Sequence, residues 1–125
     1  MKKILLRECL RIAREKNDDH PEKYRHSTFV VQSNKIVEWG INRSGDPLTS
    51  RGYPKYGKVH SENDAYRKAK GLLSDKSWEA VNVRLSKSGE LRQALPCPCC
   101  IAYLVDLGCK SVWATTPHGW AKVAL

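Results

Sequence analysis

The stretches VHSE (residues 59–62) and LPCPCC (residues 95–100) decide how this chain is organised. They supply the imidazole of His60 and the thiols of Cys97 and Cys100. Zinc in proteins takes nitrogen and sulfur ligands, and a catalytic zinc ion keeps three protein ligands and one open position for water. We therefore predict that His60, Cys97 and Cys100 are the ligands of one Zn²⁺ ion.

Two further residues of these stretches have side chains that could take part in the site. Glu62 is not needed as a ligand, and a carboxylate beside a metal ion can carry protons to and from a reacting group. Cys99 could replace either neighbouring cysteine, but the Cys-x-x-Cys spacing of Cys97 and Cys100 suits one ion better than adjacent thiols do. The alternative is a structural zinc site that uses His60 and all three cysteines, in which Glu62 has no role.

Each motif stands at the start of a predicted helix. The first helix runs from His60 to about residue 70 or 73, and the helix dipole favours Glu62 in its first turn. The second helix opens with Pro98, which suits the first helical position, and Gly108 closes it. A helix N-terminus also lowers the pKa of a thiol and so favours the thiolate that a metal binds. The core-facing residues of the first helix would be Ala65, Ala69, Leu72 and Leu73.

The pattern His-x-Glu followed by Pro-Cys-x-x-Cys is the signature of the zinc-dependent nucleobase deaminases. On these motifs the sequence resembles that superfamily, which includes the cytidine, deoxycytidylate and tRNA-adenosine deaminases. A looser likeness in the order of elements extends over residues 27–116. The resemblance implies a cytidine deaminase-like α/β fold of the three-layer type, with zinc as cofactor. It also implies hydrolytic deamination of a nucleobase, with Glu62 as the catalytic residue that carries protons.

The same resemblance implies three substrate contacts. Asn42 matches an asparagine that hydrogen-bonds the sugar, although a turn asparagine at a strand end is almost equally expected. Ser61 replaces the usual alanine between the histidine and the glutamate, at the place that holds the edge of the base. Arg43 follows Asn42 as in the tRNA-adenosine deaminases and would meet a phosphate. Ser44 stands where deaminases of free cytidine commonly carry a glutamate, which argues against a free nucleoside.

Residues 44–58 form a long predicted loop that glycines and prolines punctuate. Basic and aromatic side chains are interleaved in and beside it, namely Arg43, Arg51, Lys55, Lys58, Tyr53 and Tyr56. This combination suits contact with phosphates and stacking on bases. We expect the loop to rim the pocket, with Tyr53 and Tyr56 as substrate contacts. A solvated loop without a binding role is the alternative.

The remaining segments predict the element order α-β-β-α-β-α-β-β. The predicted first helix covers residues 2–16, and the strands cover residues 27–32, 35–41, 81–85, 111–116 and 120–125. The three residues 117–119 cannot contain a crossover helix, so the last two strands must be antiparallel. That arrangement resembles the cytidine deaminases more than the tRNA-adenosine deaminases, which use a helix and a parallel strand. We predict a mixed five-stranded sheet with helices over it, as a single domain over residues 1–125.

Composition limits the class of protein. No apolar run approaches the roughly 18 residues that span a bilayer, and the five cysteines, three of them within residues 97–100, do not form a disulfide pattern. We therefore expect an intracellular, cytoplasmic protein without a membrane partner. The net charge of +9 favours an anionic partner, either a nucleotide or nucleic acid, although many basic proteins carry such a charge for solubility alone. A homo-oligomer is compatible with the sequence.

Together these observations predict a zinc-dependent hydrolase that converts cytosine to uracil in a phosphorylated substrate. The substrate would be single-stranded DNA or RNA, or a cytidine nucleotide. Two alternatives stay open from the sequence. One is an adenosine deaminase that acts on tRNA, and the other is a non-catalytic zinc module that binds nucleic acid.

Overall fold

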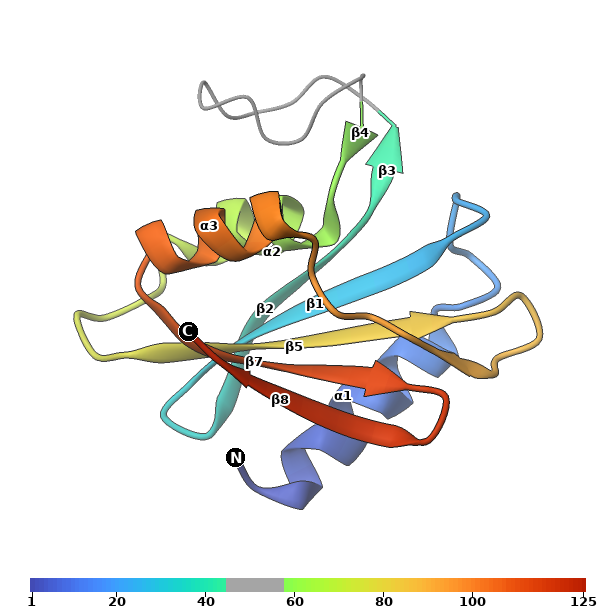
Figure 1. Ribbon diagram of the computed structural model, residues 1–125, viewed down its shortest axis with the longest axis horizontal. Helices are drawn as coiled ribbons and strands as arrows, with labels where there is room; N and C mark the ends of the chain where they lie inside the picture. Colours follow the sequence, from blue (N-terminus) through green and yellow to red (C-terminus); the bar gives the residue numbers. More distant parts are fainter. Residues whose placement is uncertain (45–57) are drawn as a thin grey trace.

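A computed structural model describes residues 1–44 and 58–125 of the chain (Figure 1). The elements are α1 (Lys3–Glu15), β1 (Arg25–Gln32), β2 (Lys35–Ile41), β3 (Arg43–Ser44), β4 (Lys58–Val59), α2 (Ser61–Ala69), β5 (Trp78–Leu85), β6 (Leu91–Arg92), α3 (Pro98–Asp106), β7 (Cys109–Thr116) and β8 (Gly119–Ala124). Apart from the two-residue strands β3, β4 and β6, this is the predicted order. Two-residue strands are too short for a hydrophobic period to reveal.

The main sheet has the strand order β2-β1-β5-β7-β8, and β6 pairs with β5 beside this path as a sixth strand. β5 and β7 are parallel, whereas β1 pairs antiparallel with both β2 and β5. β7 and β8 are antiparallel, as the short turn between them requires. The mixed sheet with an antiparallel last pair is thus confirmed, with β6 added. β3 and β4 form a separate two-stranded sheet.

The helices cover both faces of the main sheet, α1 on one face and α2 with α3 on the other (Figure 1). Alternation along β1 and β5 divides their side chains between the two faces. Phe29 and Val81 pack with α1, whereas Val30 and Ala80 pack with α2 and α3. None of the described helices is long and apolar enough to cross a membrane. The result is the predicted three-layer architecture.

The end of α2 differs from the sequence prediction. α2 ends at Ala69, so Ala65 and Ala69 are buried as expected. Leu72 lies beyond the helix end and is 63% exposed, whereas Leu73 is partly buried against the core. The expectation for Leu72 was wrong because a helical period was extended past the last helical turn.

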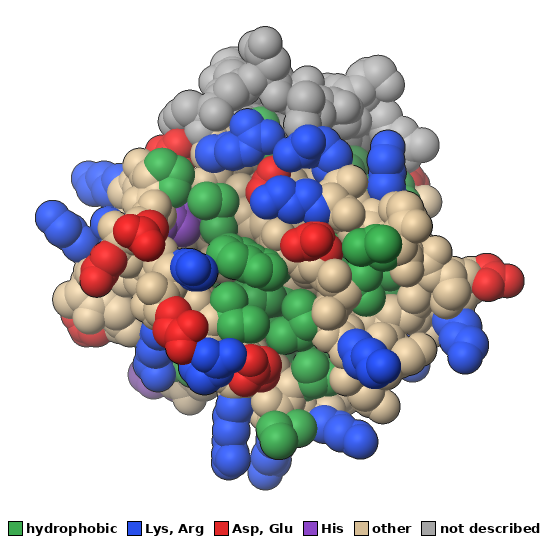
Figure 2. All heavy atoms as spheres, turned by 180° about the vertical axis from the view of Figure 1, so that it is seen from behind, with side chains coloured by type: hydrophobic (Ala, Val, Ile, Leu, Met, Phe, Trp, Pro, Cys, Tyr) green, Lys and Arg blue, Asp and Glu red, His purple; other side chains and the backbone are tan. Residues whose placement is uncertain are grey.

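The surface charge is spread widely. Seen from behind, lysine and arginine side chains lie among acidic ones around a central area of hydrophobic side chains (Figure 2). On this face the basic side chains are therefore dispersed rather than gathered in one patch.

α2 lies unusually close to β2, and this contact positions the first predicted motif. A Cβ atom at Gly40 would lie 2.4 Å from the backbone nitrogen of Ala65 and 2.7 Å from the carbonyl carbon of Asp64. One residue further on, the backbone N–H of Ile41 donates to Oδ2 of Asp64 at 3.1 Å. The strand and the helix are thus joined one turn after His60.

We expect Gly40→Ala to lower the free energy of unfolding by about 1–3 kcal/mol or more, because the new methyl group meets rigid backbone atoms. Gly71→Ala is the matched control, since a Cβ there has no heavy atom within 4 Å. That control should leave stability unchanged or raise it by up to about 1 kcal/mol. Urea unfolding of both variants measures the difference, and equal stabilities would contradict the close contact of α2 with β2.

Candidate functional site

The two predicted motifs meet where α2 and α3 begin. His60 caps the N-terminus of α2, Cys97 caps that of α3, and Cys100 lies in the first turn of α3. The possible ligand atoms of the three residues all lie within 4.8 Å of one another. Nδ1 of His60 is 2.9 Å from Sγ of Cys100. Tetrahedral zinc at ordinary bond lengths separates its ligands by about 3.5–3.8 Å, so the cluster fits such an ion with small side-chain adjustments.

The other cysteines lie elsewhere. Cys9 and Cys109 are buried in the two hydrophobic cores, as expected, and burial raises the pKa of each thiol to about 12. Cys99 is exposed and is not in the cluster. The described residues therefore do not form a structural site with Cys99 as the fourth ligand.

The pKa of the Cys100 thiol is raised, whereas a helix N-terminus was expected to lower it. Burial, followed by the carboxylate of Glu62 and the thiol of Cys97, raises the pKa of Cys100 above its ordinary value. Burial and these neighbours thus disfavour the free thiolate. A divalent cation beside the sulfur would offset this penalty, which is the chemistry expected of a metal ligand.

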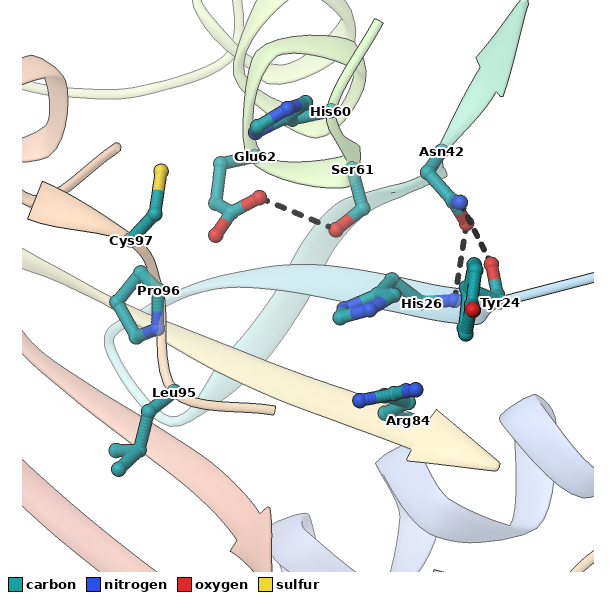
Figure 3. A pocket seen from close by; sticks show the side chains of 10 residues that line it. All are labelled: Tyr24, His26, Asn42, His60, Ser61, Glu62, Arg84, Leu95, Pro96 and Cys97. Atoms are coloured by element: carbon teal, nitrogen blue, oxygen red, sulfur yellow. Dashed lines mark hydrogen bonds between the residues drawn. The ribbon is translucent and has the colours of Figure 1, made fainter. Parts of the chain in front are cut away.

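Glu62 is 6% exposed, and its carboxylate is oriented by two neighbours. Oε2 accepts a hydrogen bond from Nδ2 of Asn82 at 3.1 Å. Oε1 lies 3.3 Å from the hydroxyl of Ser61 (Figure 3). Glu62 therefore stands beside the three-residue cluster without being part of it.

Asn82 is held in one orientation by its partners. The two hydrogens of its amide go to Glu62 and to the carbonyl oxygen of Ala94, at 3.1 and 3.2 Å. Oδ1 accepts from the hydroxyl of Thr28 at 2.8 Å, and Thr28 is the residue directly opposite on β1. Since a carboxylate and a carbonyl can only accept, the amide cannot turn over without losing these bonds. Asn82 thus fixes one carboxylate oxygen of Glu62.

A cavity of about 400 Å³ opens beside this group and is large enough for a small organic ligand (Figure 3). Its walls come from β1, β5, the start of α2 and the segment before α3. The lining residues are Tyr24, His26, Asn42, His60, Ser61, Glu62, Arg84, Leu95, Pro96 and Cys97. The cavity therefore contains the candidate proton carrier and two of the three candidate ligands.

The predicted substrate contacts are placed as follows. Asn42 lines the cavity. Its amide is also hydrogen-bonded to the backbone at the start of β1: Oδ1 accepts from the N–H of His26 at 2.9 Å, and Nδ2 donates to the carbonyl of Tyr24 at 2.6 Å. Ser61 lines the cavity next to Glu62. Arg43 lines a neighbouring cavity. Tyr53 and Tyr56 lie outside the described residues.

Arg43 is held by Asp64, a buried acid that the sequence reading did not single out. Asp64 lies 3.4 Å from the guanidinium of Arg43 and 3.2 Å from each of Arg67 and Lys68. Burial alone would raise the pKa of Asp64, but the N–H of Ile41 and the charges of Arg67 and Lys68 outweigh it and lower the pKa. The spacing of Asp64 from Arg67 and Lys68 on one helix was the available sequence signal.

Three lining residues were missed because they carry no motif, namely Tyr24, His26 and Arg84. His26 and Arg84 are directly opposite each other on β1 and β5. Burial, and then the charges of Arg84 and His60, lower the pKa of His26 to about 4, so this imidazole is neutral at neutral pH. Alternation along each strand was the only sequence signal, and it does not reveal which strands are neighbours.

The chain matches no protein-family model, and a search of curated proteins finds no significant match. Among solved structures it is similar to the dCMP deaminase of the cyanophage S-TIM5 in complex with dCMP and dUMP. The TM-score is 0.61 at 21% identity, over 90% of this chain and 81% of that one. The apo form of the same enzyme gives 0.58 at 20% identity, over 90% and 82%. This likeness confirms the predicted architecture, and the chain has the cytidine deaminase-like fold.

Proposed function

We propose that this chain is a zinc-dependent hydrolase that deaminates cytosine to uracil in a phosphorylated substrate. The observation that carries the proposal is the placement of Glu62. Its carboxylate stands in a cavity beside the cluster of His60, Cys97 and Cys100, and a buried amide orients it. A structural zinc site has no need of such a carboxylate.

The residues would divide the chemistry between them. Zinc held by His60, Cys97 and Cys100 would supply a water molecule whose pKa is lowered toward neutrality. The carboxylate of Glu62 would accept a proton from the attacking water and deliver protons to N3 of the ring and to the departing amine. Ser61 would lie at the edge of the base, and Asn42 would offer its remaining amide hydrogen or lone pair to the sugar.

Two observations favour cytosine over adenine. The last two strands are antiparallel, which is the arrangement that resembles cytidine deaminases. The similar solved structures are dCMP deaminases, one of them crystallised with dCMP and dUMP. The same neighbours support a nucleotide as substrate, whereas the net charge of +9 suits a single-stranded nucleic acid as well. Both carry the phosphate that the proposal requires.

Zinc binding can be tested separately from activity. The purified chain should carry about one zinc ion, and Cys97→Ser should remove most of it because two ligands hold the ion poorly. Cys99→Ser is the matched control and should keep full occupancy, since Cys99 lies outside the cluster. A colorimetric zinc assay after unfolding measures both variants. Zinc loss in the Cys99 variant would point instead to a four-ligand structural site.

Replacing Glu62 tests the enzymatic role. Glu62→Gln should keep its zinc but lose ammonia release by about 10²–10⁴-fold, because the amide cannot carry the proton. Glu90→Gln, at an exposed position, should leave the activity unchanged. The substrates are cytidine, dCMP, single-stranded DNA, single-stranded RNA and tRNA, with deamination read by mass. Equal activity of wild type and Glu62→Gln would remove the catalytic role, and equal rates on cytidine and dCMP would remove the phosphate requirement.

Asn82→Ala tests whether the orientation of Glu62 matters. The variant should lose about 10- to 100-fold in kcat with little change in KM, and it should keep its zinc. Gln32→Ala removes another buried amide, which bonds the backbone of Ser74 and Lys76 at the far end of β1. Both variants should lose about 1–3 kcal/mol of stability, yet only the first should lose turnover. Equal kcat values for the two variants would show that Asn82 has only a structural role.

A further inference from the structure

Two rows of side chains from β1 and β5 lie on the face of the sheet that carries the site. Thr28 lies opposite Asn82, and His26 lies opposite Arg84. The Thr28–Asn82 row is buried, and Asn82 donates to Glu62. The His26–Arg84 row is two residues away on each strand, a step of about 6.6 Å. His26 and Arg84 line the cavity that contains Glu62.

Among the residues that the structure describes, no acid compensates the charge of Arg84. Within residues 1–44 and 58–125, no carboxylate oxygen lies within 4 Å of its guanidinium. By contrast, Arg43 and Arg67 bind Asp64, and Arg92 lies 3.8 Å from Glu90. A cation that lines a cavity without a counter-ion is a ready site for an anion.

Neighbouring groups hold Arg84 in place without using up its donors. The guanidinium carbon lies 5.1 Å from the centre of the Tyr24 ring, and Nη1 donates to the carbonyl of Gln93 at 3.5 Å. Burial, and then the charge of Arg84, lower the pKa of His26, which lies opposite Arg84. Most of the five guanidinium N–H groups are left for a ligand.

We propose that Arg84, flanked by Tyr24 and His26, binds the phosphate of the substrate. This inference rests on the function proposed above. If the base lies at Glu62 and the sugar at Asn42, the phosphate lies towards His26 and Arg84. The planar guanidinium matches phosphate oxygens, and the neutral His26 can add a hydrogen bond. The phosphate belongs either to a mononucleotide or to a phosphodiester of a single strand, and the chemistry of recognition is the same.

Arg43, which the sequence suggested for this role, is less suited to it. It lines a separate cavity of about 300 Å³ that shares Tyr24, Asn42 and His60 with the first. Its guanidinium is already paired with the buried carboxylate of Asp64. Among the described residues, the uncompensated charge inside the cavity with Glu62 is that of Arg84.

The test measures binding rather than turnover. Calorimetry with zinc-loaded protein compares dUMP, deoxyuridine and a trinucleotide with a central deoxyuridine. Arg84→Met should weaken the binding of dUMP or of the trinucleotide by about 10- to 100-fold and leave deoxyuridine within about twofold. Arg92→Met is the matched control, because Arg92 is the neighbour of Arg84 on β6 and does not line the cavity. It should bind all three ligands as the wild type does.

The pattern of losses decides the outcome. A loss confined to dUMP assigns the phosphate to a mononucleotide, and a loss confined to the trinucleotide assigns it to a strand. Equal losses for deoxyuridine and dUMP, identical behaviour of the two arginine variants, or no binding of either phosphorylated ligand to the wild type would overturn the proposal.

Further measurements distinguish a loss of phosphate binding from a loss of folding and from a failure of the proposed reaction. Thermal melting by circular dichroism checks the fold, and Arg84→Lys should recover part of the lost affinity because it restores the charge without the planar fork. Because dUMP is a product, its selective binding does not depend on turnover. A wild type that binds dUMP through Arg84 but releases no ammonia from any cytosine substrate would refute the deaminase activity and leave the phosphate site standing.

Discussion

The site depends on holding two helix N-termini together over one face of a sheet. α2 begins after His60 and α3 begins after Cys97, and their ligand atoms come within 4.8 Å. α2 is tied to β2 by the close approach at Gly40 and by the bond from Ile41 to Asp64. The positive ends of two helix dipoles then face the same small volume, where they favour the anionic forms of Glu62 and the thiols. Burial opposes this and is the main cause that raises the pKa of Cys100. The favourable state of such a site is one with a cation in it.

The sheet beneath the site carries buried polar side chains that support Glu62. Along β5, Val81 and Val83 pack under α1, whereas Arg84 lines the cavity and the buried Asn82 donates to Glu62. Buried polar groups cost free energy unless they are hydrogen-bonded, and Thr28, Asn82 and Glu62 satisfy one another. Such a network holds a carboxylate more rigidly than water does. This rigidity is what a group needs if it must receive a proton in one place and release it in another.

How much of this could be predicted from the sequence depended on the kind of signal. The His60, Cys97 and Cys100 cluster followed from spacing and residue chemistry, and the antiparallel last pair followed from the length of one turn. Asn82 and Arg84 could not be found in this way, because alternation shows that they share a face but not which strand lies opposite. The register of β1 against β5 is a tertiary property, set by residues far apart in sequence. For the same reason Asn42 could be placed at a strand end, but its bonds to Tyr24 and His26 could not be foreseen.

The two ends of the cavity carry different chemical groups, which would orient a bound substrate. At one end stand Glu62, the proposed proton carrier, and the three candidate metal ligands, and at the other stands Arg84, a cation that lies against the ring of Tyr24. A neutral nucleoside would gain nothing from that cation and would leave it desolvated without a partner, which is costly. A substrate with phosphate beyond its sugar would neutralise it and, in doing so, place the base against Glu62. Binding energy from the remote phosphate would thus be used to orient the reacting ring, which is how an enzyme gains rate from a part of the substrate that does not react.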